Sequence, residues 1–400
     1  MGPLDGISVV ELAHEHVAWA GKLLADLGAD VTVVEPDGGS RQRFVGPFLE
    51  DEPGPERSLA WWHYNTGKHS VVADLERDRD QVTSLVGRSD VLLEAEPPGH
   101  LAAVGLGWEE LSQRHPHLIV VSVTPFGQAS TRSTEPITDL TLMAEAGPVW
   151  SCGYDDHSLP PVRGGGNQGY QTACHWAVMG LLVALLHRET SGRGQRVDVS
   201  MSAANNVTTE MASYGWLAAA EEMRRQTGRH AAPAATARTQ ARCRDGRYVT
   251  TGVPARDPAG FARLVDLLDR SGLRDEFPLT ALLEIGARRE TLRLTDIATD
   301  PLVAEIFTAG REVTLFLAEH LDSYDFFYET QRIGIATGVI YTPGEAMTDP
   351  SVLQRRFPTE VHHPELDRDL TYPGPPYRFS STPWSTSRAP MLGEHQHRLS

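Results

Sequence analysis

The sequence lacks the features that mark secreted, membrane-spanning and nucleic-acid-binding proteins. It has only three cysteines in 400 residues, Cys152, Cys174 and Cys243, and their spacing fits neither a disulfide framework nor a zinc motif. Positive charge is scarce: 36 lysines and arginines stand against 53 aspartates and glutamates, and the formal charge of -17 disfavours a nucleic acid or an anionic membrane as partner. No apolar run reaches the length of a membrane span, so we expect none.

The N-terminal segment also lacks a targeting signal. The first residues, MGPLDGISVVELA, place no basic segment before the apolar run, and they lack the serine or threonine of a myristoylation signal. Hydrophobic residues make up 40% of the chain, which is long enough for two domains or for one large domain with an insertion. These observations predict a soluble cytoplasmic protein.

Short apolar runs alternate with helical patterns over the first part of the chain. Residues 6–13 and 30–36 are typical of buried strands, and residues 17–29 between them have helical spacing, which predicts a β-α-β unit with a parallel strand pair. Further strand-like runs follow at 69–75, 89–95 and 117–123. Repeated units of this kind predict an open α/β sheet, with its ligand outside the carboxyl ends of the strands.

The rest of the chain alternates helices with short hairpins. Residues 170–187 form a helical run that is apolar on most faces and is expected to be buried, and residues 203–229 are predicted to be helical. A hairpin is expected around the Asp245-Gly246 turn, followed by helices over 257–328. The tail, rich in proline and glycine, is typical of an extended segment that wraps over the fold.

The string GGGNQG at 164–169 matches the G-x-G-x-x-G pattern of a dinucleotide-binding loop, and Glu189 follows about twenty residues later. Such a loop needs a strand in front of it, whereas Pro160 and Pro161 precede these glycines and cannot donate to a sheet ladder. Glu189 also ends the same helical run and not a second strand. We therefore expect no NAD or FAD at these glycines.

Several strings spread over the whole chain carry a family resemblance. In chain order they are PLDGISVVELA, LLADLGADVTVVEPDGGSRQR, NTGKHSVVADL, VGLGWEEL, LIVVSVTPFGQ, LVALLHRETSGRGQRVDVSM, DGRYV, VIYTPGEAMTDP and APMLGEH. They resemble the family III CoA-transferases, the CaiB/BaiF family. The resemblance implies a Rossmann-like large domain built from residues 1–205 and 330–400, a small α+β domain inserted at 206–329, and an interlocked dimer. It also implies acyl-CoA thioesters and free carboxylic acids as substrates.

The resemblance places Tyr170 at the catalytic position. Family members commonly read P-V-R-x-G-x-P-x-A-D-x-x-A-G, then a buried helix, then L-L-x-R-E-x-T-G-x-G-Q, and Arg163 and LLHRETSGRGQ fit this frame with Tyr170 on the aspartate. In the family that aspartate attacks the thioester and then carries CoA on its carbonyl carbon. A phenol has no such carbonyl and stays protonated at neutral pH with an ordinary pKa of ~10, so we do not expect Tyr170 to replace the aspartate.

Racemases of the family pair this aspartate with a histidine and move a proton on the acyl α-carbon. In EPITDLTLMAEAG the corresponding position is Thr138, which is no useful acid or base at neutral pH, so Tyr170 would act without a partner. The next residue, Asp139, fits the family's Tyr-Asp pattern. It is the candidate for a surviving active-site carboxylate.

The CoA-binding segment also departs from the family pattern. The family's ENFRPG reads Glu94-Ala95-Glu96-Pro97-Pro98-Gly99 here, and Ala103 stands where an arginine usually precedes LGLG. Loss of cations and gain of a carboxylate disfavour a ligand with several phosphate charges. Arg41, Arg43 and Lys68 remain as candidates for phosphate contacts, or they are solvated loop cations. The sequence therefore predicts CoA or acyl-CoA as a substrate at a weakened site, with no metal ion.

His14, Glu15 and His16 occupy the loop that the family turns toward the thioester. They are candidates for a replacement acid or base, or for a polar loop packed on a dimer partner. A metal would need further ligands, and the sequence offers none. Cys174 lies inside the apolar helical run, which is typical of an inert buried thiol.

Three hypotheses remain open from the sequence. The first is an active, homodimeric family III CoA-transferase with unusual site residues. The second is a non-catalytic or accessory subunit in a heterodimer with a relative that carries the aspartate. The third is an enzyme with new chemistry on the same scaffold, acting through Tyr170 and the loop at His14–His16. The fold does not choose among them, because function depends on the site.

Overall fold

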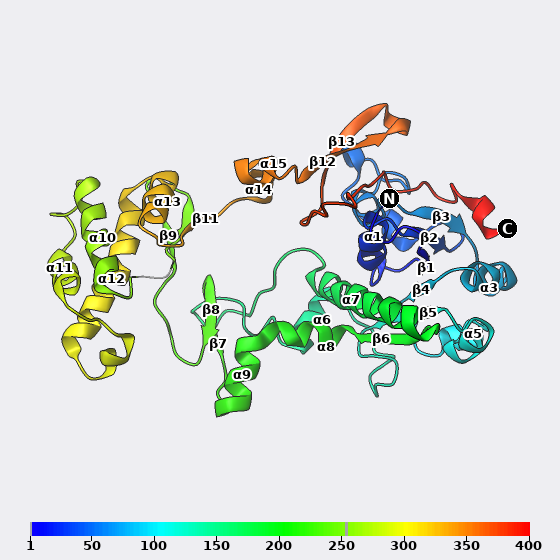
Figure 1. Ribbon diagram of the computed structural model, residues 1–400, viewed down its shortest axis with the longest axis horizontal. Helices are drawn as coiled ribbons and strands as arrows, with labels where there is room; N and C mark the ends of the chain where they lie inside the picture. Colours follow the sequence, from blue (N-terminus) through cyan, green and yellow to red (C-terminus); the bar gives the residue numbers. More distant parts are fainter. Residues whose placement is uncertain (1, 253–254) are drawn as a thin grey trace. The chain divides into compact units, whose positions relative to one another are not determined.

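The computed structural model describes residues 2–252 and 255–400, which form two compact units (Figure 1). The first unit runs to Trp150 and continues over Val162–Ala219 and Asp349–Ser400, and the second comprises Ser151–Pro161 and Ala220–Thr348. Both ends of the chain thus belong to the first unit. The boundaries lie at 219 and 349 and not at the 205 and 330 expected from the sequence.

A six-stranded parallel sheet forms the centre of the first unit. Its order, β3-β2-β1-β4-β5-β6, is that of a doubly wound Rossmann sheet. The strands are β1 (Ser8–Leu12), β2 (Asp30–Glu35), β3 (His69–Val72), β4 (Val91–Glu94), β5 (Ile119–Thr124) and β6 (Arg196–Ser200). The strand order reverses at the β1–β4 pair, and sheets of this type bind ligands at the carboxyl ends of the strands on either side of that point.

Helices cover both faces of this sheet, which explains why its strands are apolar runs. One face carries α1 (Ala18–Asp26), α6 (Asp139–Ala146), α7 (Gln168–Ser191) and α8 (Met201–Asn206), which share a core with Val9, Val31 and Val121. The other face carries α3 (Arg79–Gly87), α4 (His100–Ala103) and α5 (Trp108–Arg114), packed on Val10, Val34 and Val120. The smaller elements η1 (Arg41–Phe44), η2 (Leu49–Asp51) and α2 (Leu59–Tyr64) lie between β2 and β3.

The helix α7 corrects the expectation of a fully buried helix. It contacts α1, β5 and β6, and by length and composition alone it could cross a membrane, but half of its apolar window is buried inside the unit. Its other side presents a stripe of Trp176, Met179, Val183 and Leu186, which are 44%, 47%, 66% and 70% exposed. The helix α7 therefore has two apolar faces. In the part of the chain that the structure describes, one of them packs on the sheet and the other is exposed.

The helix predicted from the sequence over residues 203–229 ends at Ala219, so the prediction is wrong beyond that residue. After α8, η3 (Val207–Thr209) and α9 (Glu210–Ala219), the chain forms the hairpin of β7 (Arg224–Gln226) and β8 (Arg229–Ala232). Ala220, directly after α9, adopts a φ of 53°, a left-handed conformation that does not continue a right-handed helix. Gly228 then takes a φ of 65° in the turn between the two strands.

The second unit combines this hairpin with a small antiparallel sheet and a helical core. Its sheet has the order β11-β10-β9, from β9 (Gln240–Arg242), β10 (Tyr248–Thr250) and β11 (Gly338–Val339), and the hairpin expected at Asp245-Gly246 is confirmed. The helices are α10 (Pro258–Arg270), α11 (Thr280–Arg288), α12 (Pro301–His320), α13 (Ser323–Arg332) and α14 (Pro343–Thr348), with η4 (Leu294–Ala298). Residues 330–348 belong here because Val339 pairs with Val249.

The C-terminal segment returns to the first unit and contains more structure than an extended wrap. It begins with α15 (Pro350–Gln354), forms a hairpin of β12 (Pro358–His363) and β13 (Arg368–Pro373) around η5 (Pro364–Leu366), and ends in η6 (Gln396–Leu399). Leu399 enters the core beneath α3 and α5. The last residues of the chain therefore complete the sheet domain that the first residues begin.

Candidate active site

The candidate site lies where the N-terminus of α7 meets the loop between β1 and α1. Tyr170 stands in the first turn of α7 and is 4% exposed, and residues 151–167 before it contain no strand. The expectation that no strand delivers the GGGNQG glycines is therefore confirmed. A Cβ on Gly169 would stand 3.0 Å from Asp139 Oδ1 and 3.2 Å from Leu142 Cδ2, so this glycine permits the close approach of α6 and α7.

The Asp139 carboxylate caps α7. Its Oδ1 accepts the backbone N–H of Gly169 at 2.8 Å and that of Tyr170 at 3.2 Å, and its Oδ2 pairs with Arg163 Nη1 at 3.0 Å. The carboxylate is 5% exposed and satisfies two N–H groups that would otherwise lack partners at the helix start. Asp139 is thus held against α7 by three contacts, a geometry that suits a structural cap better than an attacking nucleophile.

Aromatic rings from the β1–α1 loop face Tyr170. The ring centroids of His16 and Tyr170 are 4.5 Å apart, and those of His14 and His16 are 4.3 Å apart. The His16 backbone N–H donates to His14 Nδ1 at 3.2 Å, which assigns the proton of a neutral His14 to Nε2. The structure therefore brings together His14, His16, Tyr170 and Asp139 from three separate segments of the chain.

Burial keeps these rings uncharged. Desolvation, with a smaller contribution from His14, lowers the pKa of His16 to about 3, and desolvation raises the pKa of the Tyr170 phenol above its ordinary value. Desolvation also lowers the pKa of His14. At neutral pH the site thus presents two neutral imidazoles and a neutral phenol.

Glu15 and Arg41 lie at the edge of this group. Glu15 is exposed, and its negative charge is the second largest cause of the raised pKa of Tyr170, with desolvation the largest. Arg41 is exposed in η1, and its positive charge lowers the pKa of His14, although desolvation contributes more. Of the three cations proposed from the sequence to contact phosphates, Arg41 is the one that faces solvent beside the site.

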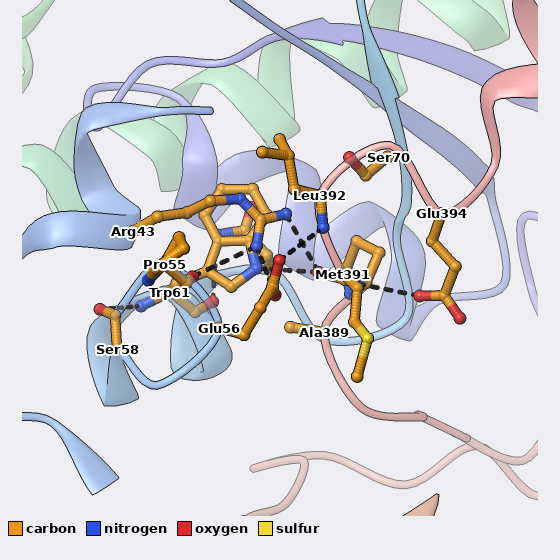
Figure 2. Close-up of polar contacts among 12 residues, drawn as sticks. Arg43, Pro55, Glu56, Ser58, Trp61, Ser70, Ala389, Met391, Leu392 and Glu394 are labelled. Atoms are coloured by element: carbon orange, nitrogen blue, oxygen red, sulfur yellow. Dashed lines mark hydrogen bonds and ion pairs between the residues drawn. The ribbon is translucent and has the colours of Figure 1, made fainter. Parts of the chain in front are cut away.

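Arg43, by contrast, is buried in an ion-pair cluster (Figure 2). Its guanidinium bonds Glu35 through Nε at 2.7 Å and Nη2 at 2.8 Å, pairs with Glu56, and lies 3.8 Å from the centroid of the Trp61 ring. Its Nη2 also donates to the carbonyl of Pro390 at 3.1 Å. The side chain is fully buried and joins the C-terminal segment to the sheet, so it does not reach a ligand in this structure.

Lys68 is buried in the same way. Its Nζ donates to Glu11 Oε1, to Asn65 Oδ1 and to the carbonyl of Ala18, each at 2.9 Å, so all three protons of the ammonium group are used. The side chain has no exposed surface. The expectation that Arg43 and Lys68 contact phosphates does not fit these positions.

The segment at the carboxyl end of β4 lines an acidic cleft of about 420 Å³. Four carboxylates border it, those of Glu94, Glu96, Glu109 and Glu110, against the single guanidinium of Arg196. Burial raises the pKa of Glu94 and of Glu96, which means that their ionised forms are disfavoured here. A further anion in the cleft would disfavour these ionised forms still more. The residues that line the cleft therefore carry more negative than positive charge.

Several residues near the site carried no signal in the sequence. Asn205 is buried and donates from Nδ2 to the carbonyl of Gly169 at 3.0 Å, which supports α7 from α8. Tyr64 accepts a hydrogen bond from Gln171 Nε2 at 3.0 Å, and Trp19 stacks on His63 with centroids 5.6 Å apart. These contacts span more than 35 residues of sequence, so no local pattern announces them.

The fold and the site together define a doubly wound α/β protein in which neutral rings of the β1–α1 loop meet a buried tyrosine at the start of α7. The model of CoA-transferase family III matches residues 4–396. The chain therefore belongs to CoA-transferase family III, the CaiB/BaiF family.

Relatives of the chain extend over nearly its full length. It is 31% identical over 397 residues to the succinyl-CoA:(R)-benzylsuccinate CoA-transferase subunit BbsE of Thauera aromatica, with 98% of this chain and 92% of the relative covered. It is 29% identical over 412 residues to the succinyl-CoA:mesaconate CoA-transferase of Haloarcula hispanica, with 100% and 96% covered. A CaiB/BaiF family protein from Brucella suis has the same fold, with a TM-score of 0.78 and 25% identity over 99% of this chain and 98% of that one.

Proposed function

We propose that this chain is a non-catalytic subunit of a heterodimeric family III CoA-transferase that moves CoA from an acyl-CoA, such as succinyl-CoA, to a carboxylic acid. In this proposal the catalytic carboxylate belongs to a related partner chain. The observation that carries the proposal is that Tyr170, the residue that the sequence motifs align with the family's aspartate, is a buried, neutral phenol.

The chemistry of the family reaction supports this division of roles. Transfer through an enzyme-bound CoA thioester requires a carboxyl carbon on which CoA resides between two half-reactions. A tyrosine oxygen offers none, and the nearby Asp139 is engaged by Gly169, Tyr170 and Arg163. Glu15 is the exposed carboxylate at the edge of the site and is the remaining candidate for a relocated nucleophile.

Two further observations favour a partner chain. One relative carries the word subunit in its name, the BbsE subunit of a succinyl-CoA-dependent transferase. The exposed stripe of Trp176, Met179, Val183 and Leu186 on α7 is an apolar surface of the kind that a protein partner covers.

A reconstitution experiment tests the proposal. The purified chain is assayed for CoA transfer from succinyl-CoA to a panel of dicarboxylic acids, first alone and then mixed with a family III relative from the same genome that carries the aspartate. We expect transfer only in the mixture. Hydroxylamine trapping with peptide mass spectrometry should then place the modified carboxylate on the partner. Tyr170→Phe should leave the activity of the mixture unchanged, whereas Asp→Ala at the partner's catalytic position should abolish it.

The opposite result is equally clear. Transfer by the chain alone at the rate of the mixture, with modification at Glu15 or Asp139, would replace the accessory-subunit proposal by a relocated nucleophile. Tyr170→Asp adds a gain-of-function control, because a trace of transfer by that variant alone would show that the remaining pocket still binds acyl-CoA.

A second candidate function rests on His16. Its Nδ1 is buried and has no hydrogen-bond partner among residues 2–252 and 255–400, and its ring contacts Tyr170. A neutral imidazole with an unused ring nitrogen can accept a hydrogen bond from a ligand, and a ligand anion bound beside it would raise its pKa toward the range in which it accepts a proton. Incubation with an acyl-CoA in D₂O tests this, since exchange of the α-proton that is lost in His16→Gln would establish acid-base chemistry without CoA transfer.

A further inference from the structure

The buried Lys68 ammonium bridges the two ends of the β1–α1 loop. Glu11 is the penultimate residue of β1, and Ala18 is the first residue of α1. The Nζ of Lys68 donates to Oε1 of the former at 2.9 Å, lies 2.8 Å from its Oε2, and donates to the carbonyl of the latter at 2.9 Å. Everything between these two anchor points is the short loop that carries His14 and His16.

The space for this pair is built into α1. A Cβ on Gly21 would stand 1.6 Å from Glu11 Oε2 and 3.0 Å from Lys68 Nζ, so the glycine leaves the room that the carboxylate fills. Asn65, three residues before the lysine, supplies the third acceptor through Oδ1. Each donor of the cation therefore has a fixed partner, and the pair is 0% and 1% exposed.

We infer that Lys68 and Glu11 are positioning residues that hold the loop carrying His14 and His16 against Tyr170. The inference deepens the proposed function, because it takes this loop as a wall of the ligand site. It also replaces the phosphate contact expected of Lys68 from the sequence. An unpaired charge at this depth is strongly destabilising, so the pair fixes the distance between β1 and α1 far more firmly than a surface contact would.

The loop has other supports, and most of them are local. The Cys174 thiol, a weak donor, bonds the carbonyl of His16 at 3.1 Å, and the His16 N–H donates to His14 Nδ1. Backbone bonds hold the two ends separately: the Ala13 N–H donates to the carbonyl of Val34 in β2 at 3.0 Å, and the Ala18 N–H donates to the carbonyl of His14 at 3.1 Å. The ammonium group of Lys68 differs from these supports because it bonds β1 and the start of α1 at the same time.

A matched pair of double variants tests the inference. Glu11→Gln/Lys68→Met removes the bridge, and Lys22→Met/Asp26→Asn removes a second buried ion pair on the same helix α1, whose atoms lie 2.8 Å apart and do not contact the loop. The readout is the ring ¹³Cε1–¹Hε1 spectrum of the full chain labelled at histidine. Single variants His14→Gln and His16→Gln assign the two signals. The melting temperature of each protein is recorded in parallel.

We expect both double variants to lose thermal stability to a similar extent, whereas only Glu11→Gln/Lys68→Met shifts or broadens the His14 and His16 signals. Unmoved signals, or equal changes in the two variants, would reduce the pair to a purely structural role. If this variant fails to fold, Glu11→Gln/Lys68→Gln serves, because it also leaves no buried charge unpaired while the shorter side chain at position 68 no longer reaches the Ala18 carbonyl. It should likewise shift or broaden both signals, and unmoved signals would overturn the inference. Failure of the reconstitution assay would leave this result untouched, so the two proposals fail separately.

Discussion

Gly21→Ala should destabilise the protein although alanine is the better helix former. In an ordinary helix interior the change gains about 1 kcal/mol. Here the new methyl group would stand 1.6 Å from Glu11 Oε2, and this carboxylate is 1% exposed and cannot swing into solvent. It must leave Lys68, and breaking a buried ion pair costs about 3–5 kcal/mol. The expected net loss is about 2–4 kcal/mol.

Urea unfolding followed by tryptophan fluorescence measures this loss, and a thermal scan should show a melting point lower by roughly 5–15 °C. Gly344→Ala in α14 is the control, since its Cβ would meet nothing within 4 Å, and it should not lower stability. A Gly21→Ala protein as stable as wild type would show that Glu11 moves aside without cost. The positioning role of its pair with Lys68 would then lose its physical basis.

Three further predictions concern charge at the site. The pKa of His16 is about 3 in the folded chain and about 6.5 in the unfolded chain, so between these two values only the unfolded chain binds the proton. From pH 7.5 to pH 5, the free energy of unfolding of the wild type should therefore fall by about 2 kcal/mol more than that of His16→Gln, as measured by urea titration. Equal losses would contradict a neutral imidazole at His16. Glu96→Arg should tighten CoA binding on the order of tenfold in calorimetry, because it turns a repulsive group into a charge-assisted donor, while the exposed Glu52→Arg should change nothing. Asp139→Ala should lower the free energy of unfolding by about 1–3 kcal/mol through loss of the α7 cap. An unchanged urea midpoint would show that Asp139 is not a structural cap, and it would again be a candidate nucleophile.

The sequence predicted the strands of the sheet well because a covered parallel strand is an apolar run that can be recognised by itself. It predicted less well where distant contacts decide the structure. The helix expected to continue to residue 229 ends at Ala219, where the next residue takes a left-handed backbone conformation. The hairpin of β12 and β13 has little apolar alternation from which it could be predicted. The exposed stripe of α7 could not be predicted, because the sequence pattern of an apolar residue is the same whether it packs inside its own chain or against another chain.

The site shows the same limit for charged residues. Lys68 and Arg43 were expected to contact phosphates because they are among the few cations that remain in the segments resembling the family's CoA site. Their partners Glu11 and Pro390 lie 57 and 347 residues away along the chain, and no local spacing reveals them. The helix that begins near Tyr170, in contrast, was predicted from the sequence, because its long apolar run can be recognised locally. The alignment of Tyr170 with the family's aspartate remains a prediction.

The Arg43 cluster sets an order on the making of this protein. The guanidinium is sealed in by the Pro390 carbonyl, and Ser70 and Glu56 bind the neighbouring N–H groups of Gly393 and Leu392. During synthesis, the β2–β3 edge of the sheet therefore lacks these contacts until residues 390–393 have emerged from the ribosome. The second unit, contained within residues 151–348, can reach its own fold before that moment. The domain whose first strand is synthesised first is thus completed after the domain inserted into it, and a chain truncated before Pro390 would leave Arg43 and Ser70 without these partners.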